Sequence, residues 1–192
     1  SIATYSLWLF WKDFNAVTKK NNELPIASVS WKYKAAQRKF SDRLIWDRLQ
    51  QDSPVYNGDT IRTAAGAETT VTFANSELHL GENTIIQIQM DDTGTTSVNL
   101  TGGSLSANSS VGSKMQLKSG NVMVELQEGS SLNARAVSSD TAALSLQVIA
   151  GNAIINSADG NHSIVQGDAM SMGKDGNISL RPITILEPAS NL

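Results

Sequence analysis

The chain has 192 residues, of which 40% are hydrophobic and 17% charged, and its formal net charge is −3. This length fits one ordinary domain with a buried core, and the low charge content indicates an all-β protein with many polar turns. The sequence contains no cysteine, which excludes disulfides, thiolate metal sites and thiol catalysis.

The charges are unevenly distributed along the chain. Residues 1–62 carry ten Lys or Arg and six Asp or Glu, whereas residues 63–192 carry five and twelve. Ordinary solvated surface charges explain this difference. A functional basic face in the first part of the chain is the alternative.

The first predicted element is a helix over residues 5–18. Residues 2–11 are almost uncharged and contain two tryptophans and a tyrosine, which is typical of the interfacial end of a membrane helix. A polar linker follows at residues 18–23, and Pro25 prevents the helix from continuing. Alternatively, the helix is amphipathic and packs on the domain, with an apolar face made of Leu7, Phe10, Trp11 and Phe14.

From Ile26 the pattern changes to that of a strand, with Val29, Trp31 and Tyr33 at every second position. The segment 35–51 fits a helical stripe as well, but we expect a strand, a turn and a short strand because β patterns follow. Turns rich in Gly, Asn and Asp separate the later strands. Their expected ranges are Thr70–Phe73, Glu77–Leu80, Thr84–Met90, Val98–Leu100, Lys114–Leu117, Val122–Leu126, Leu144–Ile149, Ala153–Ile155, Ser163–Val165, Ala169–Met172 and Ile178–Leu180.

One local pattern recurs among these strands. An apolar strand end is followed by a glycine, a small or polar residue and a new apolar alternation, at Gly103, Gly120, Gly151 and Gly167. Glycine lets the backbone fold back sharply, so each instance predicts a sharp reversal between short strands. Loose repetition of this unit favours a β-solenoid or a rolled sandwich.

The sequence offers no recognisable catalytic set. His79 and His162 lie far apart and have no carboxylate or second histidine at ligand spacing, so we expect no metal site. The glycine patterns that bind phosphates or dinucleotides are missing as well. We therefore expect a non-enzymatic protein with no cofactor and no small-molecule substrate.

Residues 31–48 combine basic and aromatic side chains, as nucleic-acid platforms do. Two aspartates interrupt this segment and the whole chain is acidic, which argues against nucleic acid as a partner. A solvated sheet face with cross-strand pairs, or a protein-contact face, is the better hypothesis. The candidates for a contact face are Trp31, Tyr33, Arg38 and Lys39. An enzyme or a carbohydrate-acting domain is the competing hypothesis, and its candidates are exposed Trp31, Trp46, Asp59 and Glu77.

The most distinctive stretch is NGDTIRT at residues 57–63. Its Asn-Gly pair predicts a turn in which Asp59 accepts backbone N–H groups. On the strand that follows, we expect Ile61 to face the core and Arg62 to pair with a carboxylate. A structural role is therefore expected for this stretch rather than a direct function.

A longer ordered motif surrounds this stretch. It runs from Trp46-x-x-Leu49 through Pro54-Val55-Tyr56-x-Gly58-Asp59-x-Ile61-Arg62-Thr63 to the strands that end at Phe73, Leu80 and Ile88. This order resembles the FecR domain family, specifically over residues 26–90 and more weakly over 98–185. The resemblance implies a structural role for the residues of the family motif, which are Trp46, Gly58, Asp59, Ile61, Arg62 and Thr63.

The resemblance implies an all-β fold, a FecR-type twisted β-solenoid or rolled β-sandwich of many short strands, preceded by one N-terminal helix. Residues 1–24 would be a juxtamembrane helix and linker, and residues 25–186 the FecR-like β domain. Residues 187–192 would begin a linker to a following module.

The resemblance also implies a periplasmic domain anchored to the inner membrane through a span before Ser1. The best-known members pass a signal from an outer-membrane receptor to a sigma factor. We therefore expect a non-catalytic domain for protein–protein interaction or transmembrane signalling, with another envelope protein as partner. A cell-wall or carbohydrate-binding β-module is the alternative.

Overall fold

A computed structural model describes residues 4–6, 8, 19–20, 23–136, 144–157, 160–173 and 178–182. Within these ranges the first strands are β1 (Ala27–Tyr33), β2 (Ala36–Lys39), β3 (Asp47–Arg48), β4 (Pro54–Val55), β5 (Thr60–Thr63), β6 (Glu68–Thr72), β7 (Ser76–Leu80) and β8 (Ile85–Met90). The later strands are β9 (Thr96–Ser109), β10 (Met115–Ser119), β11 (Val122–Leu126), β12 (Ser131–Ala136), β13 (Leu144–Ala150), β14 (Asn152–Ser157), β15 (Gly160–Val165), β16 (Asp168–Met172) and β17 (Ile178–Pro182). The expected all-β class is thus confirmed.

The N-terminal expectations fall largely outside the described residues. Residues 4–6 and 8 are helical, but the rest of the helix predicted over 5–18 and the linker predicted at 187–192 are not described. In the described part of the chain, no helix has the length and apolar character needed to cross a bilayer.

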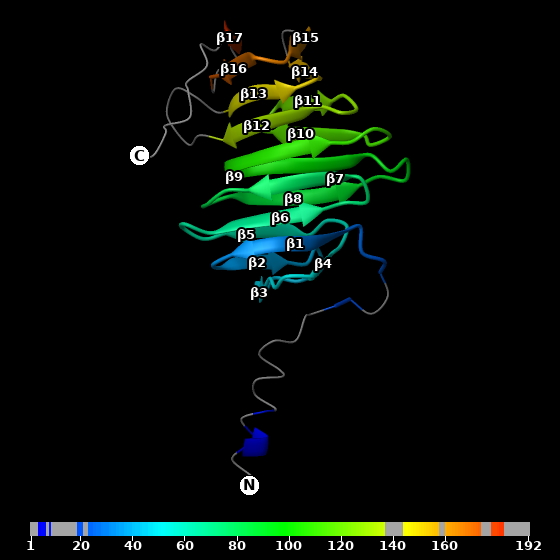
Figure 1. Cartoon of the computed structure of the whole chain (residues 1–192), viewed down its shortest axis with the longest axis vertical. Coiled ribbons are helices and arrows are strands. Elements are labelled where there is room, and N and C mark those ends of the chain that lie inside the picture. Colours follow the sequence, from blue (N-terminus) through cyan, green and yellow to red (C-terminus); the bar gives the residue numbers. More distant parts are fainter. Residues whose placement is uncertain are drawn as a thin grey trace, which may run out of the picture.

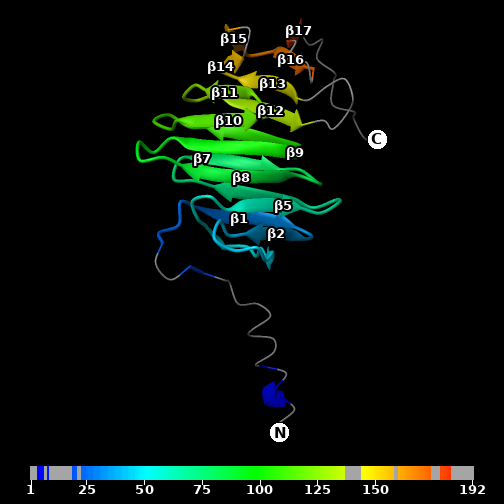
Figure 2. The same cartoon turned by 180° about the vertical axis from the view of Figure 1, so that it is seen from behind.

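The strands form two layers that lie face to face, and within each layer the strands follow one another along the long axis of the molecule (Figures 1 and 2). Sheet A has the order β4-β1-β6-β7-β9-β12-β13-β16-β17. Sheet B has the order β3-β2-β5-β8-β9-β10-β11-β14-β15. Strands β1 to β5 lie at one end of the stack, called the basal end here, and β14 to β17 lie at the other (Figure 1).

Strand β9 belongs to both layers. Its first half pairs with β8 and β10 in sheet B, and its second half pairs with β7 and β12 in sheet A. The strand crosses between layers at Gly102 and Gly103, where Gly103 has a φ of +84°. The prediction of a strand that ends near Leu100 was wrong, because the glycines bend the strand without ending it.

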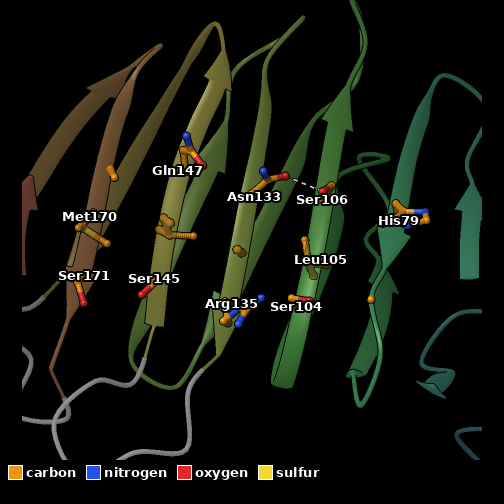
Figure 3. Close-up of a pocket in the computed structure, with 14 residues that line it drawn as sticks. His79, Ser104, Leu105, Ser106, Asn133, Arg135, Ser145, Gln147, Met170 and Ser171 are labelled. Atoms are coloured by element: carbon orange, nitrogen blue, oxygen red, sulfur yellow. Dashed lines mark hydrogen bonds between the residues drawn. The ribbon is translucent and has the colours of Figure 1, made fainter. Parts of the chain in front are cut away.

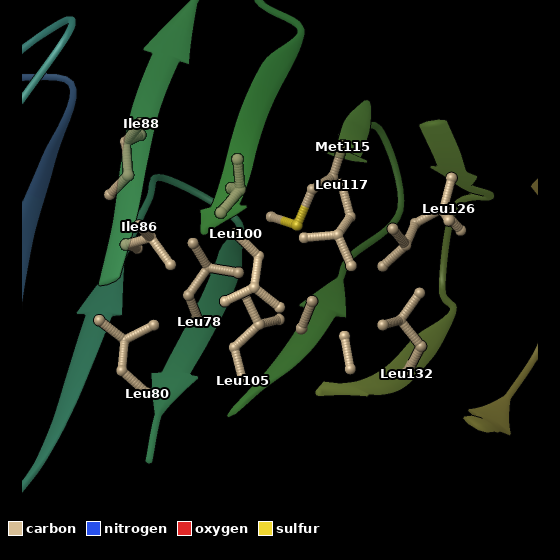
Figure 4. Packing of buried hydrophobic residues seen from close by; sticks show 14 of the residues in the cluster. Leu78, Leu80, Ile86, Ile88, Leu100, Leu105, Met115, Leu117, Leu126 and Leu132 are labelled. Atoms are coloured by element: carbon tan, nitrogen blue, oxygen red, sulfur yellow. The ribbon is translucent and has the colours of Figure 1, made fainter. Parts of the chain in front are cut away.

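The core lies between the two layers. Leu78, Leu80 and Leu105 of sheet A face Ile86 and Ile88 of sheet B (Figure 4), and each is at most 3% exposed. The alternation of buried and exposed positions follows from the period of two along a strand. One cluster of buried apolar side chains runs from the first strand to β16.

The alternation of apolar and polar residues predicted some strands correctly and missed another. The segment 35–51 is indeed a strand, a turn and a short strand, as expected. Strand β12 was missed, because its buried positions are Leu132 and Ala134 and so it offers only one large apolar residue.

Candidate functional site

The NGDTIRT stretch forms a buried polar centre at the basal end. Gly58 has a φ of +82°, and Asp59 Oδ2 accepts the backbone N–H of Tyr56 at 2.9 Å, as expected of the turn. The carboxylate lies 3.9 Å from Arg38 Nε, and both side chains are almost fully buried. Arg38 Nη1 also donates to the carbonyl of Pro54, so this pair links β2, β4 and the start of β5.

Burial controls the ionisation of this pair. Burial raises the pKa of Asp59 to about 6, against the opposing effects of the Tyr56 N–H and the Arg38 charge. Burial likewise lowers the pKa of Arg38. The hypothesis of an exposed, reactive Asp59 was therefore wrong, because this carboxylate has no contact with solvent.

The other motif residues surround this centre. Ile61 is fully buried, as expected. Arg62 was expected to pair with a carboxylate, but its Nε donates to Gln37 Oε1 at 2.7 Å and its guanidinium lies 4.0 Å from the centre of the Trp46 ring. Thr63 Oγ1 donates to the carbonyl of Gly81 at 2.6 Å and ties β5 to the end of β7.

The four residues predicted as one interaction face lie in different places. Trp31 and Tyr33 are 43% and 54% exposed on the outside of sheet A, whereas Lys39 belongs to sheet B and Arg38 is buried. A register shift between Val29 and Trp31 turns the tryptophan outward. Arg38 and Lys39 are separated from it because β1 and β2 belong to opposite layers.

Trp31 belongs to a partly exposed cluster on sheet A. Its ring stacks on His79, with centroids 5.9 Å apart and planes inclined by 24°. Nδ1 of His79 lies 3.0 Å from Thr70 Oγ1, and Nε2 lies 3.5 Å from Glu68 Oε2. We call these four residues the Trp31–His79 cluster. It holds an aromatic side chain in a fixed position on the surface.

His79 also lines a groove that runs across the outer face of sheet A. The groove has a volume of about 540 Å³ and is formed by β7, β9, β12, β13 and β16 (Figure 3). Its polar lining is mostly hydroxyl and amide groups, and Ser106 Oγ donates to Asn133 Oδ1 at 2.6 Å. Arg135 and His79 are the ionisable side chains among the described lining residues, so the lining contains no carboxylate.

This groove was not predicted from the sequence. Its signal is the run of short polar residues at outward positions, which Ser104, Ser106, Ser145 and Ser171 supply from three strands. Short side chains leave the face hollow between larger neighbours. Across the described ranges, no group of three or more His, Cys, Asp or Glu could hold a metal ion.

The chain is similar to a known protein family and to a protein of known sequence. The model of the FecR protein family matches residues 59–176, more than half of the chain. An uncharacterised protein of Treponema pallidum (strain Nichols) is 38% identical over 65 residues, which are 33% of this chain and 10% of that protein. The chain thus spans a small part of that relative's length.

Two crystal structures of a candidate anti-sigma factor from Parabacteroides distasonis ATCC 8503 share the fold. They superpose with TM-scores of 0.56 and 0.55 at 17% identity, over 64% of this chain and 59% of theirs. The match of the family model and the shared β architecture agree with the motif around Gly58 and Asp59. The chain belongs to the FecR family.

Proposed function

We propose that this chain is a non-catalytic regulator of cell-envelope signalling that binds another envelope protein through the outer face of sheet A. The groove next to the Trp31–His79 cluster is the observation that carries this proposal. Membership of the FecR family, which is generally associated with the envelope, supports it. The candidate anti-sigma factor from Parabacteroides distasonis shares the fold, and this supports a role as a signalling regulator.

The groove has the dimensions and chemistry of a polypeptide site. It crosses five strands, and neighbouring strands lie about 4.8 Å apart, so its length is roughly 19 Å, or about six extended residues. Hydroxyl and amide groups can pair with a backbone that crosses them. Trp31 and Tyr33 supply the aromatic anchors that often dominate protein interfaces.

The location and extent of the domain belong to the same proposal. We place it in the periplasm, anchored to the inner membrane through a span before Ser1. We assign residues 25–186 to the β domain, and the buried cluster from Ala27 to Met172 supports a single domain over most of this range. The crossing of β9 between layers supports a twisted solenoid or rolled sandwich of FecR type.

The test compares two outward-facing serines of β9, one in the half that belongs to sheet A and one in the half that belongs to sheet B. Ser106 lies in the groove, whereas Ser97 lies on the outside of sheet B. A photoreactive p-benzoylphenylalanine at position 106 of the full-length protein in cells should give a discrete adduct with an envelope protein. The same residue at position 97 should not, and equal adducts at both positions would overturn the proposed surface.

Substitution provides the second readout. Ser106→Trp fills the groove and should reduce recovery of the crosslinked partner at least tenfold, whereas Ser97→Trp should leave it unchanged. Both positions face outward, so both variants should melt close to the wild-type temperature. Full recovery with Ser106→Trp would contradict the proposal.

A carbohydrate-binding module is the second candidate. An exposed tryptophan beside hydroxyl and amide groups is the observation that favours it, since sugars stack on aromatic faces. Isolated cell wall should then retain the wild type and release Trp31→Ala. Equal retention of both proteins, or of neither, would exclude this candidate.

A further inference from the structure

The loop between β2 and β3 presents two adjacent apolar side chains to solvent. Leu44 is 92% exposed and Ile45 is 71% exposed. We call residues 41–46 the basal loop, since β3 lies at the basal end of the stack (Figure 1). Two side chains offer only a few hundred Å², well below the roughly 800 Å² that each partner buries in a standard protein interface.

Basic side chains surround this apolar pair. Arg43 lies over Phe40, and Lys39 and Arg62 both lie over the ring of Trp46, at 5.6 Å and 4.0 Å from its centre. Arg48 follows in β3. The described residues 19–62 hold nine Lys or Arg and five carboxylates, which are Glu23, Asp42, Asp47, Asp52 and the buried Asp59. Glu23 and Asp42 lie 3.0 Å and 3.6 Å from Lys20 Nζ. The basal end is therefore the positive pole of a domain whose remainder is acidic.

The N-terminal segment enters the fold at this same end. The backbone N–H of Lys20 donates to Tyr56 Oη at 3.0 Å, and its ammonium lies over the rings of Phe40 and Tyr56. Lys20 therefore lies beside the basal loop, where its ammonium is 3.6 Å from Asp42 Oδ1. Among the described N-terminal residues, the aromatic Tyr5 and Trp8 are 62% and 57% exposed.

We propose that the basal loop docks on an anionic lipid bilayer. Leu44 and Ile45 enter the boundary between headgroups and acyl chains, while the surrounding cations bind headgroup phosphates. Apolar residues flanked by basic ones are the chemistry of interfacial membrane binding. Such docking would point the long axis of the stack away from the bilayer and leave the groove of sheet A accessible from the side.

Vesicle binding by the full chain tests the loop. Vesicles of phosphatidylcholine with about 30% phosphatidylglycerol should bind the wild type, and pure phosphatidylcholine vesicles should bind it much less. Leu44→Ser/Ile45→Ser should weaken binding at least tenfold. Arg43→Gln/Arg48→Gln should weaken it roughly fivefold per charge, with a smaller dependence on salt. Val111→Ser removes an apolar side chain of 78% exposure from another loop and should bind as the wild type does.

A fluorescent probe separates the loop from the N-terminal segment, which all variants share. Because the chain has no cysteine, Ile45→Cys and Val111→Cys can each be labelled with an environment-sensitive NBD group. Anionic vesicles should shift the emission of the probe at position 45 to the blue and leave the probe at position 111 unchanged. A solvent-like probe at position 45 on vesicle-bound protein would overturn the proposal.

Discussion

At the scale of single residues, the pair of Arg38 and Asp59 explains why the family motif is built around a Gly-Asp step. The aspartate closes the turn through the Tyr56 N–H, and the arginine fixes the Pro54 carbonyl. A buried ion pair of this kind adds little net stability, yet removal of one partner leaves an uncompensated charge that costs about 3–5 kcal/mol. The motif therefore specifies the geometry of the basal end, in line with our proposal that it is structural.

The ionisation of Asp59 predicts an unusual pH dependence of stability. Its pKa rises from 3.8 to about 6 on folding, so the folded state holds the proton more tightly. The stabilisation that protonated Asp59 adds to the free energy of unfolding is fully present below pH 3.8. It is lost as pH rises through 6, a change on the order of 3 kcal/mol. Relative to Asp59→Asn, the wild type should lose this free energy of unfolding between pH 4 and pH 7, measured by urea denaturation.

An exposed aspartate, Asp91, should change stability with pH in the opposite direction and serves as the control. Hydrogen bonds from the Thr93 hydroxyl and the Thr95 N–H lower the pKa of Asp91. Its contribution is present above its unfolded pKa and is lost as pH falls. Wild type and Asp91→Asn should therefore differ less at low pH. A parallel pH profile for wild type and Asp59→Asn would show that Asp59 titrates normally.

At the scale of elements, the recurring glycines have different structural roles. Gly120 makes a hairpin within sheet B, whereas Gly103, Gly151 and Gly167 lie where the chain crosses between layers. A Cβ at Gly103 or Gly151 would overlap a neighbouring backbone or hydroxyl, while Gly167 has open space around it. The reversals could be predicted from the sequence because glycine marks them, but the close approach of a second segment could not.

Two glycines with almost the same backbone conformation allow the cost of left-handed backbone strain to be measured apart from the cost of a steric clash. Gly103 and Gly112 have φ angles of +84° and +81°, but only Gly103 lies against the backbone of Thr84. Gly112→Ala should cost about 1–2 kcal/mol through its left-handed conformation. Gly103→Ala should cost at least about 3 kcal/mol, because a backbone neighbour must move. Equal denaturation midpoints for the two variants would show that the backbone around Gly103 can move without cost.

At the scale of the whole molecule, the outer faces were the hardest feature to predict. Alternation located most strands, and the turn at Gly58 could be predicted from its residue types. The groove was hidden because Ser104 and Ser171 resemble any solvent-facing positions, and only strand pairing brings them to one face. Trp31 and Arg38 were assigned together because they are close in sequence, although β1 and β2 lie in opposite layers.

The continuous core predicts that the stack unfolds as one unit, although stacked repeats can also unfold from one end. Ile155 in β14 is fully buried at the end opposite Trp31 and Trp46. Ile155→Ala should cost about 2–5 kcal/mol. In a background with Trp8 and Trp11 changed to Phe, tryptophan fluorescence would monitor the basal end and far-UV circular dichroism the whole stack. Because β9 joins both layers, both midpoints should fall equally; an unchanged fluorescence midpoint would mean that the basal end folds independently.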